Sequence, residues 1–346
     1  MSIFYLGSYT EMLGRNFGGS GTGIYVVELN EQTGVLTHLS TMETVNPSYM
    51  VKSPDKSFLY AVSEVVQIKH PKVKAYRINE DYSLSFVNEI SVSGSLPCHI
   101  EFQNNNVFVA CYGTGNVIQY KVNDDGALVN EISNIKHSGS SINRERQEAP
   151  HAHQVVIHPN KNQIFVPDLG IDKVKAYQLK NNLLSVDYNS DIKIPEGLGP
   201  RHLVFKKDGK IGYVINELSG DVSILVRSGS SFTFKKNIKS LPDTFTGLPS
   251  SSALRIHPSE TFLYVANRTL DTITIFKIVT DDLVLVDYTY TQGKTIREFN
   301  ISPNGIWLIA CLQDSNETIV YRILLNGKLD EVYRSTSFTS PVCVAF

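Results

Sequence analysis

The pattern of apolar and polar residues along this chain is typical of short β-strands. One clear unit is GLGPRHLVFKKDGKIGYVINEL at residues 197–218, in which the runs LVF and IGYVI flank the turn KKDGK. This pattern predicts an antiparallel hairpin. Because the start of one strand lies beside the end of the next in a hairpin, Arg201 and Glu217 are expected to meet at its open end.

The hairpin pattern recurs along the chain at a spacing of about 45–53 residues, which is the range of propeller blades. The copies begin at Pro47, Pro97, Pro150, Pro200, Ser251 and Thr295. Two further strands with alternating apolar and polar residues lie between copies, as in VIQYKV at residues 117–122. Each repeat is therefore predicted to form four antiparallel strands. No segment has the pattern of a helix of three turns.

The two ends of the chain supply the parts of one further repeat. The segment SPVCVAF at residues 340–346 has the pattern of a first strand without a hairpin partner, and IFYLGSYT at residues 3–10 that of a second strand. We therefore predict an all-β protein in which residues 1–346 form a single seven-bladed β-propeller domain. Its blades are four-stranded and antiparallel, and the N- and C-terminal strands close one blade, which removes open sheet edges.

Composition narrows the class of protein. Hydrophobic residues make up 42% of the chain, charged residues 19%, and the net charge is −2. This balance is typical of a soluble protein and lacks the surplus of Lys and Arg that binding to nucleic acid requires. There is no secretory signal pattern and no apolar run near the ~20 residues of a membrane span. We expect a cytoplasmic protein with no nucleic-acid or membrane partner.

The propeller geometry predicts where the chemistry lies. First strands line the central channel, and the loops that enter first strands and leave second strands share one face. A channel mouth with convergent polar groups is the default binding site. The residues expected there are Tyr9, Tyr49, Glu64, His99, Tyr112, His151, His153, Asp168, Arg201, Asn216, Glu217, Asn267, Arg268, Arg297, Gln313 and Asp314.

Several of these residues have simpler structural explanations. Arg201 and Glu217 could form an ordinary ion pair, His99 fits a core histidine, and Arg297 fits a surface ion pair. His151 and His153 would point to the same side of a strand, as metal ligands can, but no third ligand has a compatible spacing. We therefore predict that the site holds no metal.

Other catalytic classes lack their motifs. The segment GGSGTG at residues 18–23 is not followed by the helix that a phosphate-binding loop needs. There is no Gly-x-Ser-x-Gly motif, and the four cysteines have no evident base and fit small buried residues. No cofactor is expected. The polar segment HSGSSINRERQEA at residues 137–149 is a long loop beside the mouth, and its charges fit a solvated surface as well as a functional role.

Five segments together resemble a known family. SSINRERQEAPHAHQ, GLGPRHLVF, VINEL, LYVANRT and IREFNISPNG are similar to the seven-bladed propeller lactonases, which include bacterial 6-phosphogluconolactonases and the fungal carboxy-cis,cis-muconate lactonising enzymes. The resemblance covers essentially the whole chain. It implies a lactone-processing site with His153 (or His151), Arg201, Glu217 and Arg268 as catalytic residues. His151, Gln147, Asn216 and Arg297 are the substrate-binding residues that we expect with them.

The leading functional hypothesis is a lactonase that hydrolyses 6-phosphogluconolactone, a small phosphorylated substrate. Ring opening requires an activated water and a stabilised oxyanion, for which Glu217 or His153 could be the base and an arginine the oxyanion donor. Two alternatives stay open. The arginines could bind carboxylates in a lactonising or other sugar-acid enzyme, or the propeller could bind a metabolite or a protein without catalysis. We expect a solvent-filled mouth, where replacing Arg201 or Glu217 leaves the fold intact.

Overall fold

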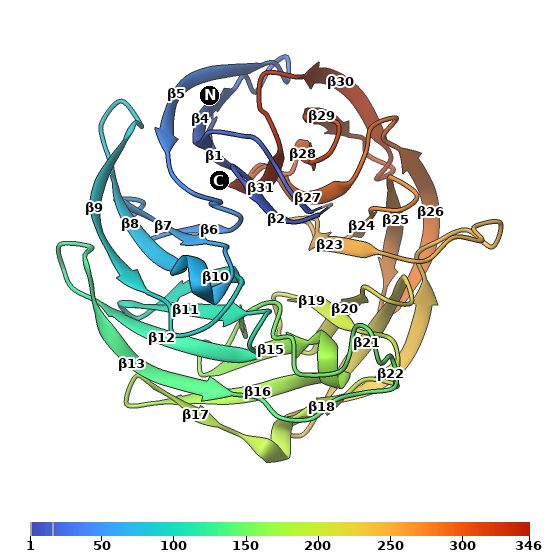
Figure 1. Ribbon diagram of the computed structural model, residues 1–346. Coiled ribbons are helices and arrows are strands. Elements are labelled where there is room, and N and C mark those ends of the chain that lie inside the picture. The colour runs from blue at the N-terminus through green and yellow to red at the C-terminus, as the bar shows by residue number, and fades with distance from the viewer. Residues whose placement is uncertain (1, 16) are drawn as a thin grey trace.

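The repeating hairpins form the inner halves of sheets that are arranged in a ring around a channel (Figure 1). The structure is a computed structural model and describes residues 2–15 and 17–346. In these residues seven sheets form the ring, and the seven-bladed β-propeller fold is confirmed. Each blade is antiparallel, and neighbouring strands in the sheet follow one another along the chain in five of the seven blades. A sixth blade keeps this order but has an extra short strand that also pairs with its third strand. Every blade therefore presents its first strand to the channel.

Each blade runs from an innermost strand beside the channel to an outermost strand at the rim of the ring. The innermost strands are β6 (Met50–Lys52), β10 (Pro97–Gln103), β14 (Val156–Ile157), β19 (Pro200–Phe205), β23 (Ser251–Ile256), β27 (Ile296–Ile301) and β31 (Pro341–Ala345). The second strands are β7 (Phe58–Ser63), β11 (Asn106–Cys111), β15 (Gln163–Asp168), β20 (Ile211–Asn216), β24 (Phe262–Asn267), β28 (Trp307–Leu312) and β1 (Ser2–Ser8). Most of the functional positions lie in these strands or directly beside their ends.

The outer strands complete the blades. The third strands are β8 (Lys72–Ile78), β12 (Asn116–Val122), β16 (Lys173–Lys180), β21 (Asp221–Ser228), β25 (Thr272–Val279), β29 (Glu317–Ile323) and β4 (Gly23–Leu29). The outermost are β9 (Leu84–Ser91), β13 (Leu128–Lys136), β17 (Leu183–Val186), β18 (Ile192–Lys193), β22 (Ser231–Lys239), β26 (Asp282–Tyr290), β30 (Leu329–Ser335) and β5 (Leu36–Glu43). Helix is limited to the short 3₁₀ turns η1 (Gln67–Lys69), η2 (Leu169–Ile171) and η3 (Tyr188–Ser190) in the described chain.

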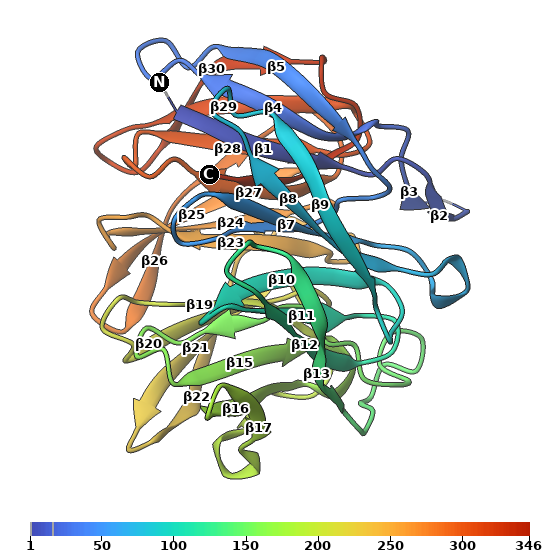
Figure 2. The same cartoon turned by 90° about the vertical axis from the view of Figure 1, so that its left-hand side faces the viewer.

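The two ends of the chain share one blade. β31 pairs antiparallel with β1, so that Tyr5 lies opposite Ala345 and Leu6 opposite Val344, and β4 and β5 complete the sheet. Figure 1 shows both termini in this blade, as the sequence predicts. After β1 the chain forms a small hairpin, β2 (Met12–Gly14) with β3 (Phe17–Gly18), which extends beyond the blades in Figure 2.

The core lies between neighbouring blades. In one such layer Tyr60 and Val62 of β7 pack with Ile100, Val109 and other residues of the next blade. Aromatic hydroxyls cross the same boundaries, because Tyr60 Oη donates to the carbonyl of Gly126 at 3.0 Å. The four cysteines are free and buried, as predicted. The described residues contain no helix with the length and apolar content of a membrane span.

Candidate active site

The innermost strands begin at one mouth of the channel, where side chains surround a cavity of about 310 Å³. Three arginines and two glutamates lie in its wall, together with a histidine and an aromatic ring from the β2–β3 hairpin. The lining residues are Phe17, Glu64, Leu96, Cys98, Tyr112, Arg146, His153, Glu217, Ser250, Arg268 and Arg297. The mouth predicted from the repeats is therefore a cavity with a largely polar and charged wall.

A repeated β-bulge directs the first-strand residues toward the channel. In β19, Pro200 pairs with Asn216 and His202 with Ile215, so that Arg201 has no cross-strand partner. Cys98 in β10 and Arg297 in β27 are left out of their ladders in the same way. A bulge turns the unpaired residue out of the regular alternation of a strand. It explains how adjacent residues of one strand can both face the channel.

Glu217 is the centre of the charge cluster. Arg146 Nη2 lies 2.6 Å from its Oε1, while Arg268 Nη2 and Arg201 Nε lie 2.9 and 3.1 Å from its Oε2. The Glu217 side chain is only 6% exposed. The predicted meeting of Arg201 and Glu217 is confirmed, and two further guanidinium groups share the carboxylate.

The backbone around Gly199 fixes this arrangement. Gly199 has φ +69°, and a Cβ atom there would lie 2.6 Å from Leu218 Cγ, so a side chain would be strained and would clash. Its carbonyl accepts a hydrogen bond from Glu217 N at 2.7 Å, and its own N–H donates to Asp172 Oδ1 at 2.7 Å. The glycine therefore joins the start of β19 to the end of β20 beside the charged groups.

The charges set the protonation states of the cavity. Burial alone would raise the pKa of Glu217, but Arg268, Arg146 and Arg201 outweigh it and hold this pKa well below the usual range. Burial, with Arg201 nearby, also keeps the pKa of His153 well below its usual value. Near neutral pH the cavity therefore holds a carboxylate and a neutral imidazole. Burial raises the pKa of Cys98, which stays a thiol and a poor nucleophile.

A second polar group lies across the cavity. Arg297 Nη2 donates to Tyr9 Oη at 2.8 Å, and Tyr9 Oη donates to Glu64 Oε2 at 2.8 Å. The Arg297 guanidinium also lies over the Phe17 ring, with its central carbon 5.0 Å from the ring centre. Arg297, predicted as a binding residue, is thus held against the β2–β3 hairpin at the rim.

The loop at residues 137–149 reaches into the cavity through Arg146. Its base is fixed by Asp168, whose Oδ1 accepts the His151 N–H at 2.7 Å and whose Oδ2 contacts His137 Nδ1 at 2.5 Å. His137 Nε2 in turn contacts the Tyr177 hydroxyl. Asp168 therefore joins both ends of the loop that carries Arg146. Arg146 thus makes a contact in the cavity, although its side chain is 40% exposed. The other charged residues of the loop, Arg144, Glu145 and Glu148, are exposed, which fits the surface interpretation.

The residues singled out in the sequence fall into two groups. His153, Glu217, Arg268 and Arg297 line the cavity. Arg201 is buried behind Glu217, where its Nη1 contacts the Ser252 carbonyl and lies 3.1 Å from His202 Nε2.

The other three predicted residues make their contacts outside the cavity. His151 stacks on Tyr112, with ring centres 4.4 Å apart, and its Nδ1 lies 2.9 Å from the Tyr112 carbonyl oxygen. Gln147 donates to Asp172 Oδ2 at 2.8 Å, and Asn216 donates to Ser223 Oγ at 2.8 Å. Gln147 and Asn216 therefore stabilise the loop and the blade, and the structure brings neither into the wall of the cavity.

Sequence reasoning did not select several residues of the wall, namely Phe17, Glu64, Tyr112 and Arg146. Glu64 and Tyr112 follow second strands and were expected at the mouth, but nothing in the pattern gave them a role. Phe17 comes from a hairpin outside the repeat, so periodicity carries no signal for it. In the described chain no group of three or more His, Cys, Asp and Glu residues could hold a metal ion.

The channel histidines lead to a prediction about pH. Burial holds the pKa values of His99, His153 and His202 well below 6.5. The unfolded chain therefore binds protons at these residues below about pH 6.5 while the folded chain does not, and stability falls as the pH falls. Glu101, deeper in the channel, has the opposite effect, because burial raises its pKa to about 7 and the folded state binds its proton first. Glu101 therefore cancels the effect on stability of roughly one of the three histidines.

We expect the free energy of unfolding to fall by about 3 kcal/mol for each pH unit below about pH 6.5 because of these four groups, since each proton contributes about 1.4 kcal/mol per pH unit. The melting temperature should therefore be clearly lower near pH 5.5 than near pH 7.5. His202→Gln should reduce this slope, because it removes one of the three histidines. A melting temperature that is constant over the range would contradict neutral histidines in the channel.

Comparison with known proteins agrees with this fold. The family model described as "Lactonase, 7-bladed beta-propeller" matches residues 3–346. The 6-phosphogluconolactonase of Bacillus subtilis (strain 168) is 31% identical over 353 residues, which covers 99% of this chain and 98% of that protein.

Solved structures give the same result. A Bacteroides fragilis protein proposed to be a 6-phosphogluconolactonase has a TM-score of 0.91 at 29% identity and covers 99% of this chain and 96% of its own. The periplasmic gluconolactonase of Pseudomonas aeruginosa has a TM-score of 0.92 at 27% identity, with 99% and 98% covered. The match of the family model over nearly all residues decides the assignment. This chain belongs to the seven-bladed β-propeller lactonase family.

Proposed function

We propose that this protein is a lactonase that hydrolyses 6-phosphogluconolactone to 6-phosphogluconate. The observation that supports it best is the charge of the cavity. Arg146, Arg268 and Arg297 line it and Arg201 lies directly behind, against only Glu64 and Glu217. A phosphate monoester carries about −1.5 to −2 charges at pH 7, which complements this excess of positive charge. The Bacillus subtilis relative is named for this reaction, and the Pseudomonas aeruginosa relative is named for hydrolysis of a lactone as well.

Hydrolysis requires a water to attack the lactone carbonyl carbon. In this proposal the Glu217 carboxylate takes a proton from the water as the new C–O bond forms, and Arg268 stabilises the negative charge on the carbonyl oxygen. The tetrahedral intermediate then breaks the ring C–O bond, and the ring oxygen leaves as a hydroxyl with the proton from Glu217. The product is the open hydroxy acid.

The remaining cavity residues have distinct proposed roles. Arg146 and Arg297 bind the phosphate in this proposal. Arg146 contacts Glu217 and Arg297 contacts Tyr9, so their guanidinium groups lie on different sides of the cavity and can both donate charged hydrogen bonds to a phosphate between them. His153 accepts or donates a hydrogen bond to the substrate as a neutral imidazole. Arg201 is a positioning residue, because Glu217 stands between it and the cavity. His151, Gln147 and Asn216 support this arrangement from outside.

Substrate binding would also improve the base. The arginines that lower the pKa of Glu217 are the groups that an anionic substrate would neutralise. A phosphate bound to Arg146 neutralises part of the positive charge of the arginines around Glu217. The pKa of Glu217 therefore rises toward the value at which a carboxylate accepts protons well. The free protein therefore keeps the carboxylate ionised, and the complex makes it more basic.

The test is hydrolysis of 6-phosphogluconolactone and gluconolactone in parallel, corrected for spontaneous opening. We expect kcat/KM to be at least about tenfold higher for the phosphorylated lactone, because charged hydrogen bonds contribute about 1.5–3 kcal/mol each. Preference for gluconolactone would instead favour the activity for which the Pseudomonas relative is named. Turnover of neither lactone, nor of a muconate-type lactone, would contradict catalysis and favour a binding propeller.

Arg146→Gln gives a sharper test of phosphate binding. We expect KM for the phosphorylated lactone to rise by about 10–100-fold with little change in kcat, since one charged donor is lost. KM for the unphosphorylated lactone should change far less. An equal rise for both substrates would contradict contact between Arg146 and the phosphate.

Asp168→Asn tests whether the loop base positions Arg146. The new amide would face the His137 N–H with a donor, which loosens one end of the loop. We expect KM to rise in the same direction as in Arg146→Gln but by less, and the double variant to resemble Arg146→Gln alone. A loss of kcat at unchanged KM, or additive effects in the double variant, would contradict this coupling.

The cytoplasmic location and the absence of nucleic-acid and membrane partners stay predictions from composition. One relative is named as periplasmic, so the family does not fix the compartment. Fractionation of the cells that make the protein, with detection of the intact chain, would decide it.

A further inference from the structure

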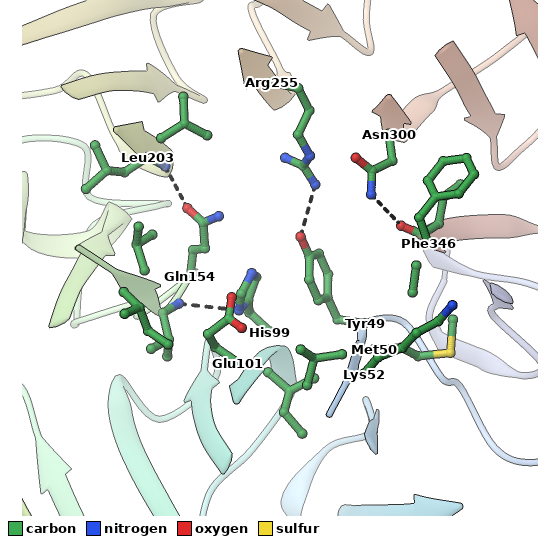
Figure 3. A pocket seen from close by; sticks show the side chains of 18 of the residues that line it. Tyr49, Met50, Lys52, His99, Glu101, Gln154, Leu203, Arg255, Asn300 and Phe346 are labelled. Carbon is green, nitrogen blue, oxygen red and sulfur yellow. Dashed lines mark hydrogen bonds between the residues drawn. The ribbon is translucent and has the colours of Figure 1, made fainter. Parts of the chain in front are cut away.

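A second cavity, of about 510 Å³, occupies the opposite end of the channel, where the innermost strands end (Figure 3). All seven innermost strands contribute to its wall, because Lys52, Glu101, Ile157, Phe205, Arg255, Asn300 and Ala345 come from β6, β10, β14, β19, β23, β27 and β31. Tyr49 and His99, which were expected at the first mouth, line this cavity instead. The proposed lactonase reaction does not use it.

Aromatic rings separate the two cavities. The His153 ring lies 5.4 Å from the His202 ring, which lies 6.1 Å from His99. The His99 ring in turn lies 4.0 Å from Tyr49, centre to centre. These side chains fill the middle of the channel, so a ligand at one end does not contact a ligand at the other. The second cavity is a site in its own right.

Glu101 brings an uncompensated carboxylate into this cavity. Its Oε1 accepts a hydrogen bond from Phe102 N at 3.0 Å, but within residues 2–15 and 17–346 no cation forms an ion pair with it. Arg255 is nearby, yet its Nη2 is held by Glu298 Oε1 at 3.0 Å and by Tyr49 Oη at 3.1 Å. Burial raises the pKa of Glu101 to about 7, as a carboxyl group without a partner requires.

Lys52 is the matching uncompensated cation. Its Nζ lies 4.8 Å from the centre of the Tyr5 ring, and Lys52 takes part in none of the ion pairs of the described chain. It is half-buried, and burial lowers its pKa to about 8. Figure 3 shows Lys52 and Glu101 on opposite sides of Tyr49, on neighbouring blades. Leaving both charges without a partner in a partly desolvated cavity costs free energy that a ligand of opposite polarity would recover.

The rest of the wall is apolar. It consists mainly of Met50, Val51, Val156, Ile157, Leu203, Val204, Phe205 and Val344. Gln154 adds a side-chain amide whose Oε1 accepts the Leu203 N–H at 2.6 Å, which directs its NH₂ group away from that strand. Ligand sites of this kind combine apolar walls with a few polar groups that fix orientation.

We propose that this cavity binds a small zwitterion of the α-amino-acid type with an apolar side chain. Its ammonium group pairs with Glu101, its carboxylate pairs with Lys52, and its side chain packs against the apolar wall formed by β14 and β19. A simple amine would leave Lys52 without a partner, and a simple acid would leave Glu101 without one. The two unpaired charges of the protein therefore select a ligand that carries both.

Calorimetric titration of the full chain with leucine, isoleucine and phenylalanine tests this proposal. We expect saturable binding of at least one of them at a single site. The two half-molecules of leucine, 3-methylbutylamine and 4-methylpentanoate, should each bind at least about tenfold more weakly, which corresponds to about 1.4 kcal/mol. If no amino acid of the three binds saturably, or if either half-molecule binds as tightly as the amino acid, the proposal is overturned.

Variants place the binding in this cavity. Glu101→Gln and Lys52→Gln should each weaken amino-acid binding at least about tenfold, since each removes one charged partner. Lys180→Gln and Glu80→Gln change exposed residues of the same charge outside the cavity and should leave binding unchanged. Melting temperatures of all four variants show whether they are folded. Unchanged binding in folded Glu101→Gln or Lys52→Gln protein would overturn the assignment, whatever the lactone assay gives.

Discussion

Glu217→Gln is expected to lower lactone turnover by about 10²–10⁴-fold, the contribution typical of a general base. The substitution keeps the shape of the side chain and removes its charge, so the cavity stays filled while the attacking water loses its proton acceptor. The measurement is kcat for 6-phosphogluconolactone at saturating substrate. It should be expressed per folded molecule, because this substitution also affects the fold.

The effect on stability follows from the three arginines around Glu217. Removing one partner of a buried ion pair typically costs about 3–5 kcal/mol, since the remaining charge stays buried. Glu298→Gln is the matched control, because Glu298 is a buried glutamate whose partner, Arg255, lies 3.0 Å away at the other end of the channel. Both variants should melt at lower temperature, but only Glu217→Gln should lose turnover. Equal turnover in the two folded variants would contradict the catalytic role.

Removal of β31 is expected to destabilise the whole ring. A chain that ends at Ser340 loses the innermost strand of the closing blade, including Val342 and Val344, which are 2% and 4% exposed. Each buried valine contributes about 1.5–3 kcal/mol, a large part of the roughly 5–15 kcal/mol that stabilises a typical protein. We expect insoluble protein or a melting temperature lowered by about 10 °C or more.

The reason is that β31 packs on both of its neighbours. Val344 belongs to the layer with Trp307 and Ile309, and Cys343 to the layer with Met50 and Leu59. The loss also leaves β1 as an open edge. Deletion of Phe346 alone is the graded control, because this residue follows the strand and leaves its ladder with β1 in place. A shortened chain that melts cooperatively at the original temperature would show that the ring closes without β31.

The fold could be predicted because the repeat has a strong physical signal. Alternation in Val117 to Val122 and turn residues such as those around Asp208 mark strands and their connections locally. The closure of the ring could be predicted by counting strands, because an unpaired first strand at one end of the chain and an unpaired second strand at the other end together complete one sheet. The strands and turns were identified from neighbouring residues and the closure from the order of the repeats, and the structure adds the register.

The site could be predicted only in part, because side-chain direction depends on features that are not local. The meeting of Arg201 and Glu217 follows from hairpin geometry, but the bulge at Arg201 is invisible in the pattern. We expected a solvent-filled mouth, whereas Arg201 and Glu217 are 3% and 4% exposed. That expectation was wrong because Arg146, from a loop 71 residues before Glu217, covers the pair. Loop conformation depends on anchors such as Asp168 that sequence spacing does not indicate.

The bulges also bear on how this scaffold can change over time. Cys98, Arg201 and Arg297 stand outside the strand ladders, so no cross-strand pair depends on which side chain is present. Each can therefore be exchanged without altering the register of its sheet. The sheets therefore do not depend on the residues that line the cavity, and new substrate preferences are accessible by substitution at Cys98 and Arg297. A combinatorial library restricted to Cys98 and Arg297 would explore recognition while leaving the sheets intact.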